Sequence, residues 1–225
     1  MRISTLLSRA LTVAMLSLAA CLPAQASLID FEDALPTLFA GAAIASGGSK
    51  FASTGSGFSG VDSAGAFVYG NAPSNSDGQF LFALNGDGLT MTDSGGGAFR
   101  LWSFDASFIA PLGGLTPNAS AGQLHLNGIS AGGQALSESF DLGLSDAGGN
   151  FGFSSLYANA LGSGGLLSVT FTACVYQSGG SCSFNDPFLP PQFALDNIKV
   201  PEPGSTALLM AAFGALALVR RRQSI

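Results

Sequence analysis

The chain predicts an all-β body, folded as an antiparallel β-sandwich of jelly-roll type, between an N-terminal signal peptide and a short C-terminal transmembrane helix. Three observations lead to this fold class. Along residues 27–199, Gly-rich turn signals recur, the segments between them alternate apolar and polar side chains, and helical periodicity is almost absent. Long apolar runs occur only near the two ends of the 225 residues. We therefore divide the chain into a signal peptide (1–26), a β-sandwich domain (27–199) and a C-terminal signal (200–225).

The first segment has the three parts of an export signal. Arg2 and Arg9 make a basic region, and Leu11 to Leu22 form an apolar stretch. Ala24 and Ala26 then define a small-x-small cleavage site. Cleavage after Ala26 would leave a mature chain that begins with the body.

A competing signal lies inside the same segment. Residues 18–21 read Leu-Ala-Ala-Cys, which resembles the lipoprotein signal of bacteria and would make Cys21 a lipidation site. Ordinary cleavage is favoured, because the Ala-Gln-Ala site is good and a C-terminal membrane helix makes a second anchor redundant. A retained N-terminal membrane anchor is the remaining alternative.

The body is acidic and poor in charge. Only Lys50, Arg100 and Lys199 are basic in residues 27–199, against 13 Asp and Glu. Nucleic-acid binding needs basic patches, so this balance excludes nucleic acid as a partner but is compatible with divalent cations. The length suits one domain with a sizeable core, to which the 18 Phe residues of the chain would contribute much.

About ten short strands are expected in the body. In the segment Gly122–Ile129, Leu124 and Leu126 alternate with polar neighbours, as on a half-buried strand. Residues 40–63 and 71–77 are rich in Gly, Ser and Asn and are expected to be loops, and residues 85–88 (Asn-Gly-Asp-Gly) a hairpin connection. The expected strands are Leu28–Glu32, Ala66–Tyr69, Gln79–Leu84, Leu89–Thr92, Ala98–Ile109, Gly122–Ile129, Gln134–Leu142, Phe151–Tyr157, Leu166–Tyr176 and Phe193–Val200.

The cysteines favour one disulfide. Once Cys21 is removed with the signal peptide, Cys174 and Cys182 remain as an even pair in an exported chain. The residues between them include two consecutive glycines that allow a turn. A metal or redox pair is the alternative, but there is no CxxC spacing and the chain has a single His.

The last segment combines a rigid turn, an apolar run and a basic end. Pro201 and Pro203 stiffen the exit from the body. The 16 residues from Gly204 to Val219 carry no charge and would form a helix of about 24 Å, shorter than the roughly 30 Å hydrocarbon core of a bilayer. The arginines that follow would stay on the cytoplasmic side, which places the body outside.

This arrangement resembles the PEP-CTERM sorting signal of Gram-negative bacteria. Pro201, Glu202 and Pro203 correspond to the Pro-Glu-Pro of that family, and Arg220, Arg221 and Arg222 to its basic end. The resemblance implies that an exosortase, a membrane cysteine protease, processes the protein near the motif. It also implies transient anchoring in the inner membrane, followed by release or transfer to the cell surface or extracellular matrix, often in bacteria that produce exopolysaccharide.

The two ends of the body carry a second resemblance. Residues 29–33 (Ile-Asp-Phe-Glu-Asp) and 193–198 (Phe-Ala-Leu-Asp-Asn-Ile) are similar to the first and last strands of jelly-roll carbohydrate-binding modules. In that group an early acid and an Asp of the last strand hold a structural calcium. The resemblance implies Glu32 and Asp196 as ligands, with Asp30 and Asn197 as weaker candidates. The alternative is that these are solvated carboxylates at strand ends.

No catalytic motif is present. His125 is expected to be an ordinary strand residue, and Trp102 a core residue in preference to a sugar-stacking platform. The expected function is non-catalytic adhesion or binding at the cell surface or in the matrix, with exopolysaccharide as the ligand. A hydrolase or lyase of matrix polysaccharide and a purely structural matrix protein are the alternatives.

Overall fold

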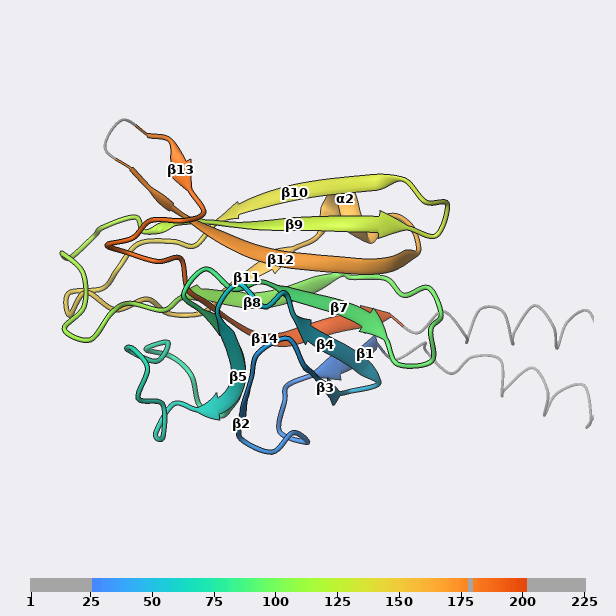
Figure 1. Ribbon diagram of the computed structural model, residues 1–225, viewed down its shortest axis with the longest axis horizontal. Helices are drawn as coiled ribbons and strands as arrows, with labels where there is room; N and C mark the ends of the chain where they lie inside the picture. Colours follow the sequence, from blue (N-terminus) through green and yellow to red (C-terminus); the bar gives the residue numbers. More distant parts are fainter. Residues whose placement is uncertain (1–25, 178–179, 202–225) are drawn as a thin grey trace, which may run out of the picture. The chain divides into compact units, whose positions relative to one another are not determined.

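The computed structural model describes residues 26–177 and 180–201. The predicted cleavage residue Ala24, the lipidation candidate Cys21 and the C-terminal helix therefore lie outside the described residues, as do Glu202, Pro203 and Arg220–Arg222. Ser27–Pro201 forms one compact unit with its own core. It consists of two packed antiparallel sheets (Figure 1), which confirms the expected all-β sandwich. Among the described residues, no helix is long and apolar enough to cross a bilayer.

The first sheet joins strands from both ends of the body. Its spatial order is β11 (Ser154–Tyr157), β8 (Ser103–Phe108), β14 (Phe193–Pro201), β6 (Gln79–Leu84), β5 (Phe58–Ser63) and β2 (Thr37–Phe39), with β1 (Ala26–Ile29) also beside β14.

The second sheet is built mainly from the middle of the chain. Its order is β10 (Ala135–Asp141), β9 (Gly122–Ser130), β12 (Leu166–Tyr176), β7 (Leu89–Asp93), β4 (Ser49–Ser53) and β3 (Ala43–Ser46), with β13 (Cys182–Ser183) beside β12. A short helix, α2 (Asn159–Gly162), contacts β10.

The core between the sheets is rich in phenylalanine, as the composition predicted. Phe104 of the first sheet meets Phe171 of the second edge to face, with ring centroids 5.5 Å apart. Strand β9 shows how alternation directs this packing, because Leu124 and Leu126 are fully buried while Asn127 is exposed.

A second apolar cluster covers part of the outer face of the first sheet. Phe80 and Phe82 of β6 point away from the main core and are fully buried. Phe67 packs on both rings from the segment that follows β5, at centroid distances of 5.3 and 5.1 Å. This segment therefore acts as a lid over that sheet.

Four expectations about local structure were wrong. Residues 40–63 contain β3, β4 and β5, where loops were expected, and residues 66–69 form no strand because their aromatic side chains pack in the outer cluster. Residues 98–102 precede β8 and do not extend it; only Phe99 makes an isolated bridge there. Residues 85–88 link β6 to β7 in the opposite sheet, so they are no hairpin.

A fifth wrong expectation concerns the single tryptophan. Trp102 is 58% exposed and lies just before β8 begins, so it is no core residue.

Candidate functional site

Carboxylates gather where β14 changes partner in the first sheet. Asp196 of β14 pairs with Asp105 of β8, so both side chains lie on the same face. Asp30 directly follows β1, and Asp77 lies shortly before β6. All four chain segments meet here because β14 pairs with β6 through Phe193–Leu195 and also with β1.

Asp196 is the electrostatic centre of this group. It is only 6% exposed, and burial is the main reason why its pKa is raised to about 7. The negative charges of Asp105, Asp30 and Asp77 raise the pKa further, against one backbone N–H, from Asn197, that favours the ionised form. The described protein atoms therefore do not offset all the negative charge of these four carboxylates.

Two residues with left-handed backbone flank the carboxylates. Asn197 has φ 49°, and its side-chain amide donates a hydrogen bond of 3.0 Å to Asp105. Phe31 has φ 60°, a conformation that is strained for a bulky side chain, and its ring is buried edge to face against Phe51. Ser155 donates a second hydrogen bond to Asp105. The backbone is thus held in unusual conformations in both segments that carry the predicted ligands, just after β1 and within β14.

The structure places the predicted calcium ligands in two groups. Asp30, Asp196 and Asn197 lie in the cluster, whereas Glu32 is exposed and accepts a 2.6 Å hydrogen bond from the backbone N–H of Gln79. Sequence reasoning missed Asp77 and Asp105, which come from segments far along the chain and carry no local motif.

The donor set suits a hard cation. Carboxylate and amide oxygens are the ligands that Ca²⁺ prefers, and a cation would offset the charge around Asp196. Among the described residues, the three-ligand group that converges within 4.8 Å is a different one, formed by His125, Cys174 and Cys182. Calcium at the carboxylates would therefore need the side chains to move closer together.

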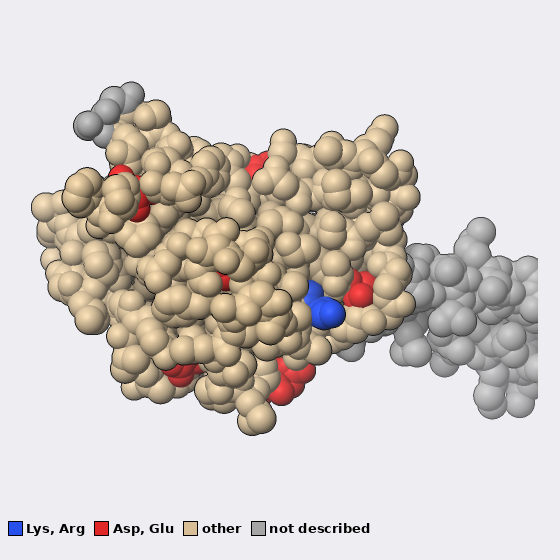
Figure 2. Space-filling model, in the orientation of Figure 1, with Lys and Arg blue, Asp and Glu red and all other residues tan. Residues whose placement is uncertain are grey.

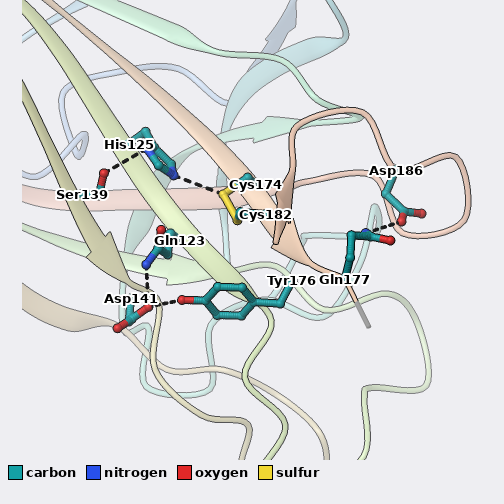
Figure 3. The surroundings of a disulfide bond; sticks show 9 residues. All are labelled: Gln123, His125, Ser139, Asp141, Cys174, Tyr176, Gln177, Cys182 and Asp186. Atoms are coloured by element: carbon teal, nitrogen blue, oxygen red, sulfur yellow. Dashed lines mark hydrogen bonds between the residues drawn. A yellow bond between two sulfur atoms is a disulfide. The ribbon is translucent and has the colours of Figure 1, made fainter. Parts of the chain in front are cut away.

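The predicted disulfide between Cys174 and Cys182 is confirmed, with its Cα atoms 5.5 Å apart. Figure 3 shows His125 beside it: Nε2 lies 3.1 Å from the Cys174 sulfur, and Nδ1 lies 2.9 Å from the Ser139 hydroxyl. Burial lowers the pKa of His125, which favours the neutral ring. Ser139 is directly opposite His125 in the β9–β10 register, a neighbour that the sequence alone did not suggest.

The nearby acid is engaged elsewhere. Asp141 accepts hydrogen bonds from the Tyr176 hydroxyl and the Gln123 amide (Figure 3), which lower its pKa. Within the described part of the chain, the two ring nitrogens of His125 face a disulfide sulfur and a serine, so no carboxylate there orients the ring as a general base. The group is thus arranged as a structural contact around the disulfide.

A row of short polar side chains crosses the outer face of the second sheet. The register places Ser137 opposite Asn127, Asn127 opposite Thr170, and Thr170 opposite Thr90. The two threonine hydroxyls are 2.9 Å apart. A hollow of about 350 Å³ lies over this row. Its lining residues are Asn127, Gly128, Ile129, Ala135, Leu136, Ser137, Ser168 and Thr170, none of them charged.

The fold and the sites define a class of protein, a two-sheet antiparallel β-sandwich with an uncharged polar face. Residues 199–223 match the family model for the PEP-CTERM protein-sorting motif, which includes the predicted Pro201–Pro203 and Arg220–Arg222. The chain therefore carries a PEP-CTERM sorting motif, which indicates a secreted, exosortase-sorted protein of the cell surface.

A solved structure shares the fold of the body. The sandwich resembles the crystal structure of a DUF4465 family protein from Bacteroides caccae, with a TM-score of 0.53 and 11% identity over 79% of this chain and 99% of that chain. An arabinose-bound MgGH51 α-L-arabinofuranosidase is also similar, with a TM-score of 0.41 and 11% identity over 79% of this chain but only 26% of that one. A comparison with curated protein sequences finds no match.

Proposed function

We propose that the body is a non-catalytic binding module of jelly-roll topology that holds extracellular polysaccharide after the chain has been sorted. The sorting step would act on a chain held transiently in the membrane of a Gram-negative bacterium by the apolar residues 204–219. Release by the exosortase would then deliver the sandwich to the cell surface or matrix.

The strand order supports the jelly-roll assignment. In a jelly roll of eight strands, strands 1-8-3-6 form one sheet and strands 2-7-4-5 the other. Numbering β6 to β12 as strands 1 to 7 and β14 as strand 8 gives the orders β6-β14-β8-β11 and β7-β12-β9-β10, which match both sheets. The earlier strands extend the two sheets at the β6 and β7 edges.

One observation carries the binding proposal, the row of hydroxyl and amide groups on the second sheet. Asn127 and Ser137 are exposed, and Thr170 is half-buried at the base of the hollow. Short uncharged donors and acceptors on a rigid sheet fit a ligand with many hydroxyl groups and no need for charge pairing. The hollow falls in the size range of small-molecule sites, so it would accommodate one or two sugar units of a longer chain.

The binding proposal is tested with the purified body, residues 27–201, and polysaccharide from the matrix of the host. We expect Asn127→Ala with Thr170→Ala to weaken binding about tenfold or more in calorimetry, because each removes a hydrogen bond to the ligand. Thr116→Ala with Ser120→Ala, on exposed loop positions away from the hollow, is the matched control. Equal affinity of both double variants, or turnover of the polysaccharide by the body, would contradict the proposal.

We also propose a structural calcium ion at Asp30, Asp77, Asp105 and Asp196, next to Asn197. The support is the surplus of negative charge around a buried carboxylate. Calcium would fix the first and last strands of the body to each other and leave the polar face free. The hydrolase alternative would assign the same Asp105–Asp196 pair to acid–base chemistry, but Asp196 is buried and the hollow over the second sheet is not lined by the pair.

A further inference from the structure

The outer face of the second sheet brings one histidine and two cysteines together. Cys174 of β12 lies opposite Gln123 of β9, and His125 follows Gln123 by two residues, so His125 and Cys174 are diagonal neighbours on one face. Cys182 reaches the same point from β13, which pairs with the end of β12. One imidazole nitrogen and two sulfur atoms therefore lie within 4.8 Å of one another.

The imidazole ring is held in the orientation that a metal ligand needs. Its Nδ1 atom lies 2.9 Å from the Ser139 hydroxyl, and its Nε2 atom lies 3.1 Å from the Cys174 sulfur. In the tautomer in which Nδ1 donates to Ser139, the Nε2 lone pair faces this sulfur. Metal-bound histidines use the second ring nitrogen in this way, because its hydrogen bond fixes the tautomer. Burial lowers the pKa of His125, which keeps the ring neutral and able to coordinate a cation.

The surroundings shield the group from water without adding positive charge. Phe184 packs against the His125 ring with centroids 5.0 Å apart, and Cys174 is fully buried. Asp141 and Asp186 lie around the disulfide (Figure 3). In Figure 2, the part of the drawn face around β13 carries acidic atoms, whereas the basic atoms lie in a separate patch. The basic residues of the body belong to β4, β14 and the segment before β8, so none lies on a strand of this group.

The oxidation state decides whether this group can bind a metal. In the oxidised protein the two sulfur atoms are bonded to each other and offer no thiolate. A dithiol reductant would transfer two electrons and two protons, which converts the pair to two thiols and the dithiol to its own disulfide. Thiols are also the state in which the chain is synthesised, before it meets an oxidising compartment. Two thiolates and one neutral imidazole form a ligand set typical of zinc.

The strands can adopt the geometry of a zinc site. With Zn–S bonds of about 2.3 Å and tetrahedral angles, the two sulfur atoms must lie about 3.8 Å apart. Cys174 is fixed on β12, whose pairing with β9 continues through Val175. Cys182 lies on β13, a strand of two residues, so it can make the adjustment without a change in the rest of the sheet. The described residues supply three ligands, and water would complete the tetrahedron.

We propose that His125, Cys174 and Cys182 form a redox-controlled zinc site, which the disulfide closes in the oxidised protein and reduction opens. Binding of Zn²⁺ at neutral pH would displace the two thiol protons into water. The ion would then link β12 to β13 in place of the covalent bond, so that β13 stays attached to the sandwich in reducing and in oxidising surroundings. Soft sulfur ligands would select zinc over calcium, in contrast to the carboxylates around Asp196.

The test uses the body, residues 27–201, which forms a compact unit, after reduction with a phosphine and removal of metal. Cobalt(II) is the probe, because thiolate ligands in a tetrahedral site give it intense absorption. We expect one cobalt ion per chain, displacement of cobalt by zinc, and no such absorption with the oxidised body. Calcium at millimolar concentration should displace neither ion. Zinc should raise the melting temperature of the reduced body.

Two variants test the imidazole and its hydroxyl partner. Ser139→Ala should weaken cobalt binding about 10–100-fold, because loss of the outer partner of a metal-bound histidine has effects of this size. His125→Ala removes a ligand and should weaken binding further. Ser183→Ala is the matched control, since alternation along β13 directs this side chain away from the face that carries Cys182. The urea midpoint of each oxidised variant shows whether it folds.

Three results would overturn the proposal. The first is a reduced body without cobalt absorption. The second is equal cobalt affinity of the wild type, Ser139→Ala and His125→Ala, which would remove the histidine from the site. The third is undiminished binding in Cys174→Ala with Cys182→Ala, which would assign the ion to other ligands. Recovery of the folded state on addition of zinc, where reduction alone unfolds the body, would support the site.

Discussion

Replacing Asp196 by Asn should change the pH dependence of stability in a direction that the structure fixes. The pKa of this carboxyl rises from 3.8 to about 7 on folding. Between these values the folded chain binds one proton more than the unfolded chain, so the free energy of unfolding falls as pH rises. The slope is about 1.4 kcal/mol per pH unit, and the total loss above pH 7 is on the order of 4 kcal/mol.

Asp196→Asn removes this ionisation. In chelator and near pH 8, the variant should therefore be more stable than the wild type by up to about 4 kcal/mol, whereas near pH 4 the two should be similar. Calcium should reverse the order at pH 8, because the ion stabilises the ionised wild-type carboxylate and has one ligand fewer in the variant.

The assay is urea unfolding of the body across this pH range, in chelator and in millimolar calcium. Asp62→Asn is the matched control, since Asp62 lies on β5 and is not one of the carboxylates that act on Asp196. A wild type whose stability does not fall between pH 5 and pH 7 in chelator would refute the electrostatic reasoning. A wild type that gains nothing from calcium would refute the metal site and leave the charge cluster in place.

Two further predictions concern the stability of the sandwich. Cys174→Ala with Cys182→Ala should lower the free energy of unfolding by about 2–3 kcal/mol, because the disulfide closes a loop with a sequence separation of 8. Reduction of the wild type should reproduce this loss. An unchanged urea midpoint would contradict the prediction. Asp87→Ala should lower the free energy of unfolding by roughly 2–4 kcal/mol in thermal or urea unfolding, because the buried carboxylate accepts hydrogen bonds from the hydroxyls of Ser53, Thr54 and Ser59. A loss below about 1 kcal/mol would contradict this account. Burial raises the pKa of Asp87, but these hydroxyls outweigh it and the pKa is lowered, so its contribution should be present above pH 4 and lost in more acidic solution.

The sequence predicted the strands that have large apolar side chains. Strands β6 and β12 begin and end where alternation and turn signals placed them, at Gln79–Leu84 and Leu166–Tyr176. Strands β3, β4 and β5 were missed because their residues are mostly Ala, Ser and Gly, which resemble loop composition. They form strands because each continues a sheet that β6 or β7 already belongs to. This pairing is a tertiary effect, which no local sequence pattern reveals.

The Asn85–Gly88 segment shows a related limit. Positive φ at Asn85 and Gly86 is what a tight hairpin turn requires, and the sequence was interpreted in that way. In the structure the same turn leads from one sheet to the other. Asp87 connects the turn to β4 and β5, because it accepts hydrogen bonds from Ser53 and Ser59. Turn chemistry thus fixes the local bend, whereas a distant hydrogen-bond network decides which sheet the next strand joins.

The carboxylate cluster was predictable from the sequence only in part. Asp30, Asp196 and Asn197 were within reach of the sequence, because the resemblance to carbohydrate-binding modules implied that the first and last strands of the body are neighbours. Asp77 and Asp105 become neighbours only through the sheet order, so the charge surplus at Asp196 was invisible in the sequence. This surplus of negative charge arises only in the folded chain. The stability of Asp196→Asn in chelator and in calcium therefore distinguishes a metal site from two strands held in a strained arrangement without a metal.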